Sequence, residues 1–236
     1  MAAPIRIDII TVFPEMFRGF LGESIPARAA KAGIASVRTV DLRDFAEDRR
    51  RTVDDKPYGG GPGMLMKPEP WFRAVEAVRS QDSRTILLGP AGKRFAQPDA
   101  ARLSRESHII LLCGHYEGFD ERVRRLADEE LSLGDFVLSG GEIAAAAVAD
   151  AVIRLLPGAL GGGADASRFE SFGEDGILEA PQYTRPPVFR GMRVPEELLS
   201  GDHAGTARWR KRQAVDLTAR RRPDLLERGG TFSAGC

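Results

Sequence analysis

Three short segments carry glycine beside residues that can bind a small molecule: GPAG (89–92), CGHYEG (113–118) and LSGGE (138–142). Each follows or ends an apolar run, and glycine allows a backbone to approach a flat ligand closely. Tyr116 and Glu117 can stack on a ligand or hydrogen-bond to it, although such a dipeptide is at least as common on a plain surface. None of the segments fits GxGxxG or GxxxxGK[ST], which disfavours a nucleotide-phosphate cradle. We therefore expect a small-molecule site of another kind.

A fourth glycine-rich stretch, DDKPYGGGPGMLM (54–66), is compatible with a linker, a phosphate cradle or a shaped recognition loop. A linker seldom carries the apolar MLM so soon afterwards, and a cradle needs a helix opened by Lys-Ser/Thr. The stretch therefore favours a shaped loop, in which Asp54 and Tyr58 offer polar groups to a ligand or to a partner subunit.

Arg154 stands among apolar neighbours, between an alanine-rich stretch and LLPG. It either extends its guanidinium to water or serves a site at the end of a helix, and both interpretations are equally good. The three histidines, His108, His115 and His203, lack paired cysteines and HxxxH spacing, so the sequence indicates no metal centre.

The elements that must position these residues follow from the hydrophobic pattern. Ile5, Ile7 and Ile9 alternate with polar residues, as in a strand, and a second extended piece is expected near ASVRTVDL. The apolar runs 85–89 and 108–114 predict strands buried on both faces of a parallel sheet. We expect a third such strand at 135–142, leading into a helix over IAAAAVADAVIRLLPG. This is an α/β plan, in which ligands bind at the carboxyl ends of the strands.

The character of the chain changes after Pro157. Residues 158–176 are rich in Gly, Ala, Ser and acids, which predicts a mobile connector. Residues 194–217 and 221–229 have helical patterns and predict a small helical C-terminal domain from about residue 177.

Composition limits the class of protein. The chain has 236 residues, 34 Lys+Arg and 34 Asp+Glu, and no apolar run of the roughly 18 residues that a membrane helix requires. Its two cysteines cannot form a disulfide framework, so a reducing cytoplasm is expected. Residues 203–228 carry eight Lys/Arg against three acids, which suits either a phosphate-facing patch or a solvated helix face.

Six motifs, in order, resemble a known family. They are RTVDDKPYGGGPGMLM, CGHYEGFDERV, SLGDFVLSGGE, RLLPGALG, PQYTRP and LLSGDHAGTARWR, and the similarity extends from Phe13 to about Leu226. Together they resemble the bacterial tRNA (guanine-N1)-methyltransferases of the TrmD family.

The resemblance implies a SPOUT-class fold, an α/β domain with a parallel sheet tied in a deep trefoil knot, plus a small helical C-terminal domain. It implies methylation of N1 of the guanosine at tRNA position 37 by S-adenosyl-L-methionine, in a cytoplasmic homodimer with shared active sites. The expected regions are a knotted cofactor domain (1–160), a mobile linker or lid (161–176) and a tRNA-binding domain (177–236). Magnesium is reported to assist this family, although no residue here is expected to be a metal ligand.

The resemblance also assigns residues. Arg154 would stabilise O6 of guanine, and a connector carboxylate would be the base. The family has Asp-Ser-Phe there, whereas this chain has Glu170-Ser171-Phe172, so Glu170 is the first candidate and Asp165 the second. The expected cofactor residues are Leu88, Gly89, Pro90, Gly92, Gly114, Tyr116, Glu117, Leu133, Gly134, Asp135, Phe136, Val137, Leu138, Gly140 and Gly141. The expected tRNA-binding residues are Asp54, Tyr58, Gly59, Pro62, Gly63, His203, Arg208 and Arg210.

Overall fold

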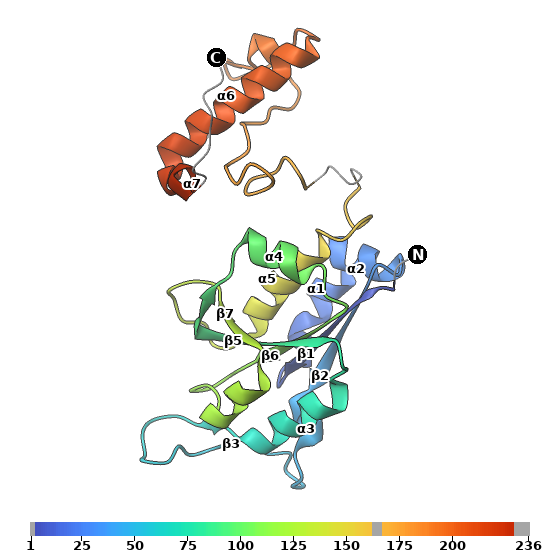
Figure 1. Ribbon diagram of the computed structural model, residues 1–236, viewed down its shortest axis with the longest axis vertical. Coiled ribbons are helices and arrows are strands. Elements are labelled where there is room, and N and C mark those ends of the chain that lie inside the picture. The colour runs from blue at the N-terminus through green and yellow to red at the C-terminus, as the bar shows by residue number, and fades with distance from the viewer. Residues whose placement is uncertain (1–2, 162–166, 229–236) are drawn as a thin grey trace. The chain divides into compact units, whose positions relative to one another are not determined.

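The computed structural model describes residues 3–161 and 167–228 (Figure 1). The chain divides between residues 163 and 164 into two compact units, which are treated separately below.

The first unit is built on a five-stranded, all-parallel sheet with the strand order β2-β1-β6-β5-β7. Its strands are β1 (Ile5–Thr11), β2 (Ala35–Asp41), β5 (Ser83–Arg94), β6 (His108–Cys113) and β7 (Glu129–Ser132). Every residue of the central strand β6 is buried, because both faces of the sheet are covered. The predicted α/β class, the parallel sheet and the strands near residues 5, 35, 85 and 108 are confirmed.

Helices cover the two faces of the sheet, with α3 on the opposite side from α4 and α5 in Figure 1. Along β1, Ile5, Ile7 and Ile9 pack in the core on the α5 side, whereas Ile10 packs in the core that contains α3. The first face carries η1 (Pro14–Phe17), α1 (Arg18–Gly22), α2 (Ser24–Lys31), α4 (Gln97–Leu103) and α5 (Glu142–Ile153). The second carries η2 (Leu42–Phe45), α3 (Pro68–Val78) and η3 (Glu121–Leu126). The alanine-rich helix is confirmed as α5.

Two predictions about the strands are wrong. Residues 89–92 do not end β5, which continues to Arg94 after a shift in its pairing with β7 between Leu88 and Lys93. Residues 135–142 do not form a strand, because the chain leaves the sheet at Ser132 and α5 begins at Glu142. The apolar run in this segment is exposed, so its hydrophobicity serves something other than the core.

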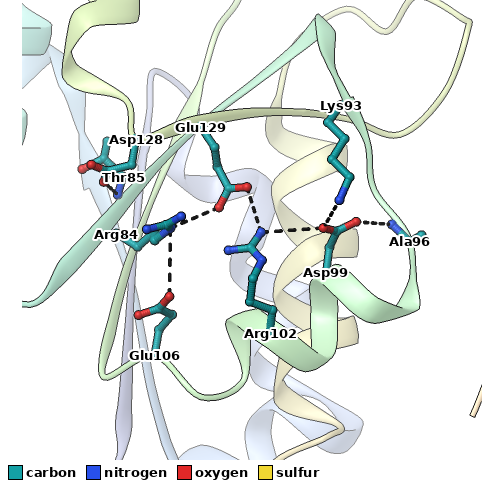
Figure 2. A network of polar contacts seen from close by, with 9 residues as sticks. All are labelled: Arg84, Thr85, Lys93, Ala96, Asp99, Arg102, Glu106, Asp128 and Glu129. Atoms are coloured by element: carbon teal, nitrogen blue, oxygen red, sulfur yellow. Dashed lines mark hydrogen bonds and ion pairs between the residues drawn. The ribbon is translucent and has the colours of Figure 1, made fainter. Parts of the chain in front are cut away.

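A polar network joins strands β5 and β7, at one edge of the sheet, to helix α4 (Figure 2). Arg102 of α4 binds Glu129 of β7 at 2.8 Å, and Glu129 also accepts a hydrogen bond from Arg84 at 3.3 Å. Asp99 accepts from Lys93 at 2.6 Å, which attaches the far end of β5 to α4. The network therefore holds in place the irregular part of β5 that contains residues 89–92 and the strand β7, from which residues 133–141 emerge.

A second cluster joins the middle of β1 and β2 to the start of β6. Asp8 is completely buried and binds Arg38, and it lies 2.7 Å from Arg6 and 2.9 Å from Nε2 of His108. Burial raises the pKa of Asp8, but the hydrogen bonds from Arg38, His108 and Arg6 outweigh it and leave the pKa below its usual range. Asp8 is therefore a buried carboxylate held ionised by its partners.

The second unit contains α6 (His203–Arg221), α7 (Pro223–Arg228), the short turn η4 (Glu196–Leu198) and a hairpin of β8 (Val188–Phe189) and β9 (Met192–Arg193). Trp209 and Thr218 are its buried α6 residues, and the Thr218 hydroxyl accepts a hydrogen bond from the backbone N–H of Leu178 at 3.0 Å. No described helix in either unit combines the length and hydrophobicity needed to cross a bilayer.

Candidate active site

A cavity of about 340 Å³ lies in the first unit where β5, β6 and β7 approach their carboxyl ends. Its size is that of a small-molecule pocket. Three chain segments line it, namely 87–90, 114–119 and a longer stretch within 130–141, together with Arg124 and Ala144. All of the predicted cofactor-binding residues belong to its lining except Gly92 and Asp135.

Those two residues have other positions. Gly92 lies inside β5, where a β-carbon would come within 2.6 Å of the backbone of Glu130 and Leu131. Asp135 points to solvent and pairs with Arg94 at 2.6 Å. Neither residue lines the cavity. Gly92 packs against the backbone of β7, and Asp135 forms an ion pair on the solvent-exposed side of its loop.

Gly140 and Gly141, in the segment LSGGE (138–142), are explained by close packing against neighbouring atoms and not by a turn of the backbone. The backbone N–H of Gly141 donates to the carbonyl of Gly114 at 2.8 Å. A β-carbon on Gly141 would lie 2.8 Å from Cα of Cys113, and one on Gly140 would collide with His115 and Glu142. The two loops that enclose the cavity are thus in direct backbone contact.

A buried carboxylate lies behind this contact. Glu142, at the start of α5, is almost fully buried and accepts a hydrogen bond from the Thr11 hydroxyl at 2.8 Å. Its other oxygen lies 3.5 Å from Nδ1 of His115, a nitrogen that has no hydrogen-bond partner. Burial, together with the charge of Glu142, raises the pKa of the Cys113 thiol well above its usual value. Cys113 is therefore a core residue and not a nucleophile.

An ion pair between Arg124 and Glu130 forms part of the cavity wall. One oxygen of Glu130 is buried without a hydrogen-bond partner, and a β-carbon on Gly89 would come within 2.5 Å of it. An unsatisfied buried acceptor favours a site whose ligand carries hydrogen-bond donors.

The remaining wall is apolar. Phe136, Val137 and Leu138 are exposed large side chains, and all three line the cavity. Tyr116 also lines it and has a φ of 58°, in the left-handed region that non-glycine residues seldom adopt. Apolar side chains, close backbone and a few polar groups together suit a flat, partly polar ligand.

The end of the glycine run 59–63 contacts Glu117, a residue that lines the same cavity. It is bracketed by the short strands β3 (Asp54–Asp55) and β4 (Leu65–Met66), which pair with each other. The N–H of Glu117 donates to the Met64 carbonyl at 3.0 Å, and a β-carbon on Gly63 would collide with the Glu117 side chain.

Most residues of this stretch that were predicted to bind RNA are exposed to solvent. Tyr58, Gly59 and Pro62 are exposed, whereas Asp54 is half-buried in β3. The stretch is a loop between two paired short strands, and its predicted role in binding a ligand or a partner subunit stays a prediction.

The two predicted catalytic residues belong to different compact units. Arg154 is half-buried at the C-terminal end of α5. Glu170 is half-buried in a turn where its carbonyl accepts a hydrogen bond from Gly173 at 2.9 Å, and the Ser171 hydroxyl accepts one from Glu179 at 3.1 Å. The alternative base, Asp165, lies outside the described residues.

The basic residues predicted to bind RNA lie on α6. His203, Arg208 and Arg210 are all exposed, and Arg208 pairs with Asp202 at 3.7 Å. A shallow hollow of about 320 Å³ on this helix is lined by Arg208, Lys211 and Arg212, together with Val215 and Asp216.

In the described ranges 3–161 and 167–228, no group of three or more His, Cys, Asp or Glu side chains is arranged to hold a metal ion.

Sequence reasoning missed four residues at the site: Thr11, His115, Arg124 and Glu130. His115 lies between Gly114 and Tyr116 in the motif CGHYEG, and that position is the only signal in the sequence that it belongs to the site. Arg124 and Glu130 lie in a charged stretch that is typical of a surface, so nothing distinguished them before the fold brought them to the cavity.

A family model and similar curated proteins all point to one family. A family model described as "tRNA (Guanine-1)-methyltransferase TrmD" matches residues 5–228. Among similar curated proteins, one from Dictyoglomus turgidum is 54% identical over 95% of this chain and 91% of its own length. Others from Geobacillus kaustophilus (52% identical, 94% and 91%) and Myxococcus xanthus (53% identical, 97% and 93%) match equally broadly. All three are named tRNA (guanine-N(1)-)-methyltransferase.

Proposed function

Because the chain belongs to the tRNA (guanine-1)-methyltransferase TrmD family, we propose that it methylates N1 of a guanosine in tRNA. We further propose that the methyl donor is S-adenosyl-L-methionine and that the guanosine is at position 37, next to the anticodon. The observation that carries the proposal is the family match over 5–228, together with a glycine-lined cavity at the strand ends.

The cavity residues fit an adenosyl group. Phe136, Val137 and Leu138 offer apolar contact to a purine, and Gly134, Gly140 and Gly141 line the same cavity without side chains. The cofactor would supply a methyl group on a positively charged sulfur, ready for transfer. The chain's residues would hold it, exclude water and present it to the guanine.

The chemistry at guanine N1 requires a base and a cation. N1 carries a proton, so a carboxylate must remove that proton as the methyl group arrives, and the negative charge that develops on O6 must be stabilised. We propose Glu170 as the base, with Asp165 as its alternative, and Arg154 as the cation. Glutamate has the same carboxylate as the family's aspartate and one more methylene, so it can serve if its loop adjusts.

Several further features belong to the proposal. We propose the SPOUT-type trefoil knot, supported by the hydrogen bond between Gly141 and Gly114 and by the bridge between His115 and Gly140. We also propose that residues 1–160, 161–176 and 177–236 act as cofactor domain, lid and tRNA-binding domain. A homodimer with shared active sites would allow the exposed loop at 58–62 to contact the second subunit. With a tRNA substrate, we propose that the reaction takes place in the cytoplasm.

The basic face of α6 would bind the tRNA backbone. Lys and Arg side chains neutralise phosphates and release counterions, so the affinity should fall steeply with salt. Because guanine N1 is hidden in a stacked base, the nucleotide must also be unstacked before transfer.

One assay tests the activity. Purified protein is incubated with radiolabelled S-adenosylmethionine and a tRNA transcript that has either guanosine or adenosine at position 37. We expect methyl transfer to the first transcript only. No transfer, or equal transfer to both, would refute the proposed activity.

A matched pair of variants tests the base. Glu170→Gln should abolish turnover while the affinity for S-adenosylhomocysteine, measured by calorimetry, stays unchanged. Asp165→Asn is the control and should remain active. Normal turnover by Glu170→Gln with loss of activity in Asp165→Asn would transfer the role to Asp165.

A further inference from the structure

The hairpin of β8 and β9 exposes large apolar side chains in the second unit. Phe189 pairs with Met192 across the hairpin, and the two connecting residues, Arg190 and Gly191, both have positive φ angles of 50° and 81°. This is the tight turn that a two-residue hairpin requires. The exposed fractions are 44% for Val188, 56% for Phe189 and 64% for Met192. A hairpin with two residues per strand has little stability of its own, so such exposure calls for a functional explanation.

The hairpin also concentrates positive charge beside an aromatic ring. The guanidinium of Arg190 lies over the Phe189 ring, 5.3 Å from its centroid. Residues 180–195 contain three arginines, Arg185, Arg190 and Arg193, and no acidic residue, while Glu179, Glu196 and Glu197 flank the segment. A flat ring next to a guanidinium, with further arginines nearby, is the combination that stacks an unpaired base and neutralises its phosphates.

The hairpin segment is attached to the basic helix. The Tyr183 ring lies 6.3 Å from the ring of Trp209, which is buried on α6. The basic face of α6 and the hairpin therefore belong to one compact unit and can contact the same RNA.

We infer that the β8–β9 hairpin is a stacking platform for an unpaired nucleotide of the RNA substrate, with Phe189 stacking on the base and Arg190 contacting its phosphate. The inference rests on the proposed function, since it takes tRNA as the partner. A protein partner would be favoured by the same apolar side chains, but the hairpin itself carries Arg190 and Arg193 and no acid, which makes it complementary to a polyanion. A second copy of this chain is the alternative that the experiment must separate.

The test measures the affinity of the full-length protein for an anticodon stem-loop RNA at several salt concentrations. Phe189→Ala should weaken binding about ten-fold, the lower range for loss of one stacked base, and should leave the slope of log affinity against log salt unchanged. Arg190→Gln should also weaken binding and reduce that slope by about one. Phe189→Trp should retain the affinity, whereas Phe189→Leu, which keeps an apolar side chain, should lose it.

Leu199→Ala is the matched control, because Leu199 is 59% exposed in the same unit but outside the hairpin. It should bind RNA as the unchanged protein does. Circular dichroism and sedimentation are measured for every variant. Unchanged RNA affinity in Phe189→Ala and Phe189→Leu would overturn the inference, and a changed sedimentation coefficient in these variants would then assign the hairpin to contact between copies. If the unchanged protein binds the stem-loop and methylates tRNA, this result would leave the proposed function intact.

Discussion

Replacement of Gly141 by alanine should disrupt the contact between the two loops of the cavity. A β-carbon there would lie 2.8 Å from Cα of Cys113 and 3.2 Å from N of Gly114. Carbon atoms in favourable contact are about 3.5–4.0 Å apart, so the loops must separate by about 1 Å. The 2.8 Å hydrogen bond between Gly141 and Gly114 would then be too long to persist.

The expected cost has two parts. Loss of a backbone hydrogen bond costs about 1 kcal/mol, and overpacking against a backbone that cannot rotate away costs about 1–3 kcal/mol. The free energy of unfolding of the first unit should therefore fall by about 2–4 kcal/mol. Affinity for S-adenosylmethionine should fall as well, because the same loops line the cavity.

Urea unfolding followed by tryptophan fluorescence measures the stability. The chain has two tryptophans, so a Trp209→Phe background leaves Trp71, which is buried in the first unit, as the reporter. Gly19→Ala is the control, because nothing lies within 4 Å of a β-carbon there and Gly19 is helical. It should be neutral or stabilising by up to about 1 kcal/mol. If Gly141→Ala has the same urea midpoint and cofactor affinity as the unchanged chain, the close-approach explanation of Gly141 is wrong.

Two further predictions concern buried charge and backbone strain. Asp8→Asn should lower the free energy of unfolding by about 2 kcal/mol at pH 7, because it weakens the charged hydrogen bonds to Arg38 and His108. Since the folded pKa of Asp8 is lowered, its stabilisation is present above its unfolded pKa of about 3.9 and disappears as the pH falls through the folded value. Urea midpoints between pH 3 and 7 should thus change less with pH in Asp8→Asn than in the unchanged chain, and parallel curves would contradict this. Tyr116→Gly should be more stable than Tyr116→Ala by about 1 kcal/mol, the reverse of the usual order, because only alanine keeps a β-carbon at φ 58°; thermal unfolding of the pair shows whether the order reverses.

Much of the fold was predictable because it depends on local pattern. Ile5, Ile7 and Ile9 alternate with polar residues, and α5 has a continuous apolar helix pattern, so both elements were identified from spacing alone. The segment at 135–142 was mistaken for a strand because periodicity cannot tell an apolar run that enters the core from one that lines a cavity.

The site was predictable in part for the same reason. Glycine-bearing loops after buried strands indicated the cavity, since parallel strands end at one edge of a sheet. The partners of Glu142 could not be predicted, because Thr11 and His115 reach it only through the three-dimensional path of the chain. The pair of Arg124 and Glu130 likewise needed the positions of η3 and β7.

The hydrogen bond between Thr11 and Glu142 has a consequence for the kinetics of folding. It joins residues 131 positions apart, the first strand of the unit and its last helix. Contacts of such high sequence separation form slowly, because the chain loses the entropy of closing a long loop before these contacts stabilise it. A nascent or truncated chain that ends before α5 lacks this hydrogen bond and the helix that covers one face of the sheet, even though β1, β5, β6 and β7 are already synthesised. Ligand binding at this cavity therefore stabilises the folded unit relative to every form in which the cavity is not assembled.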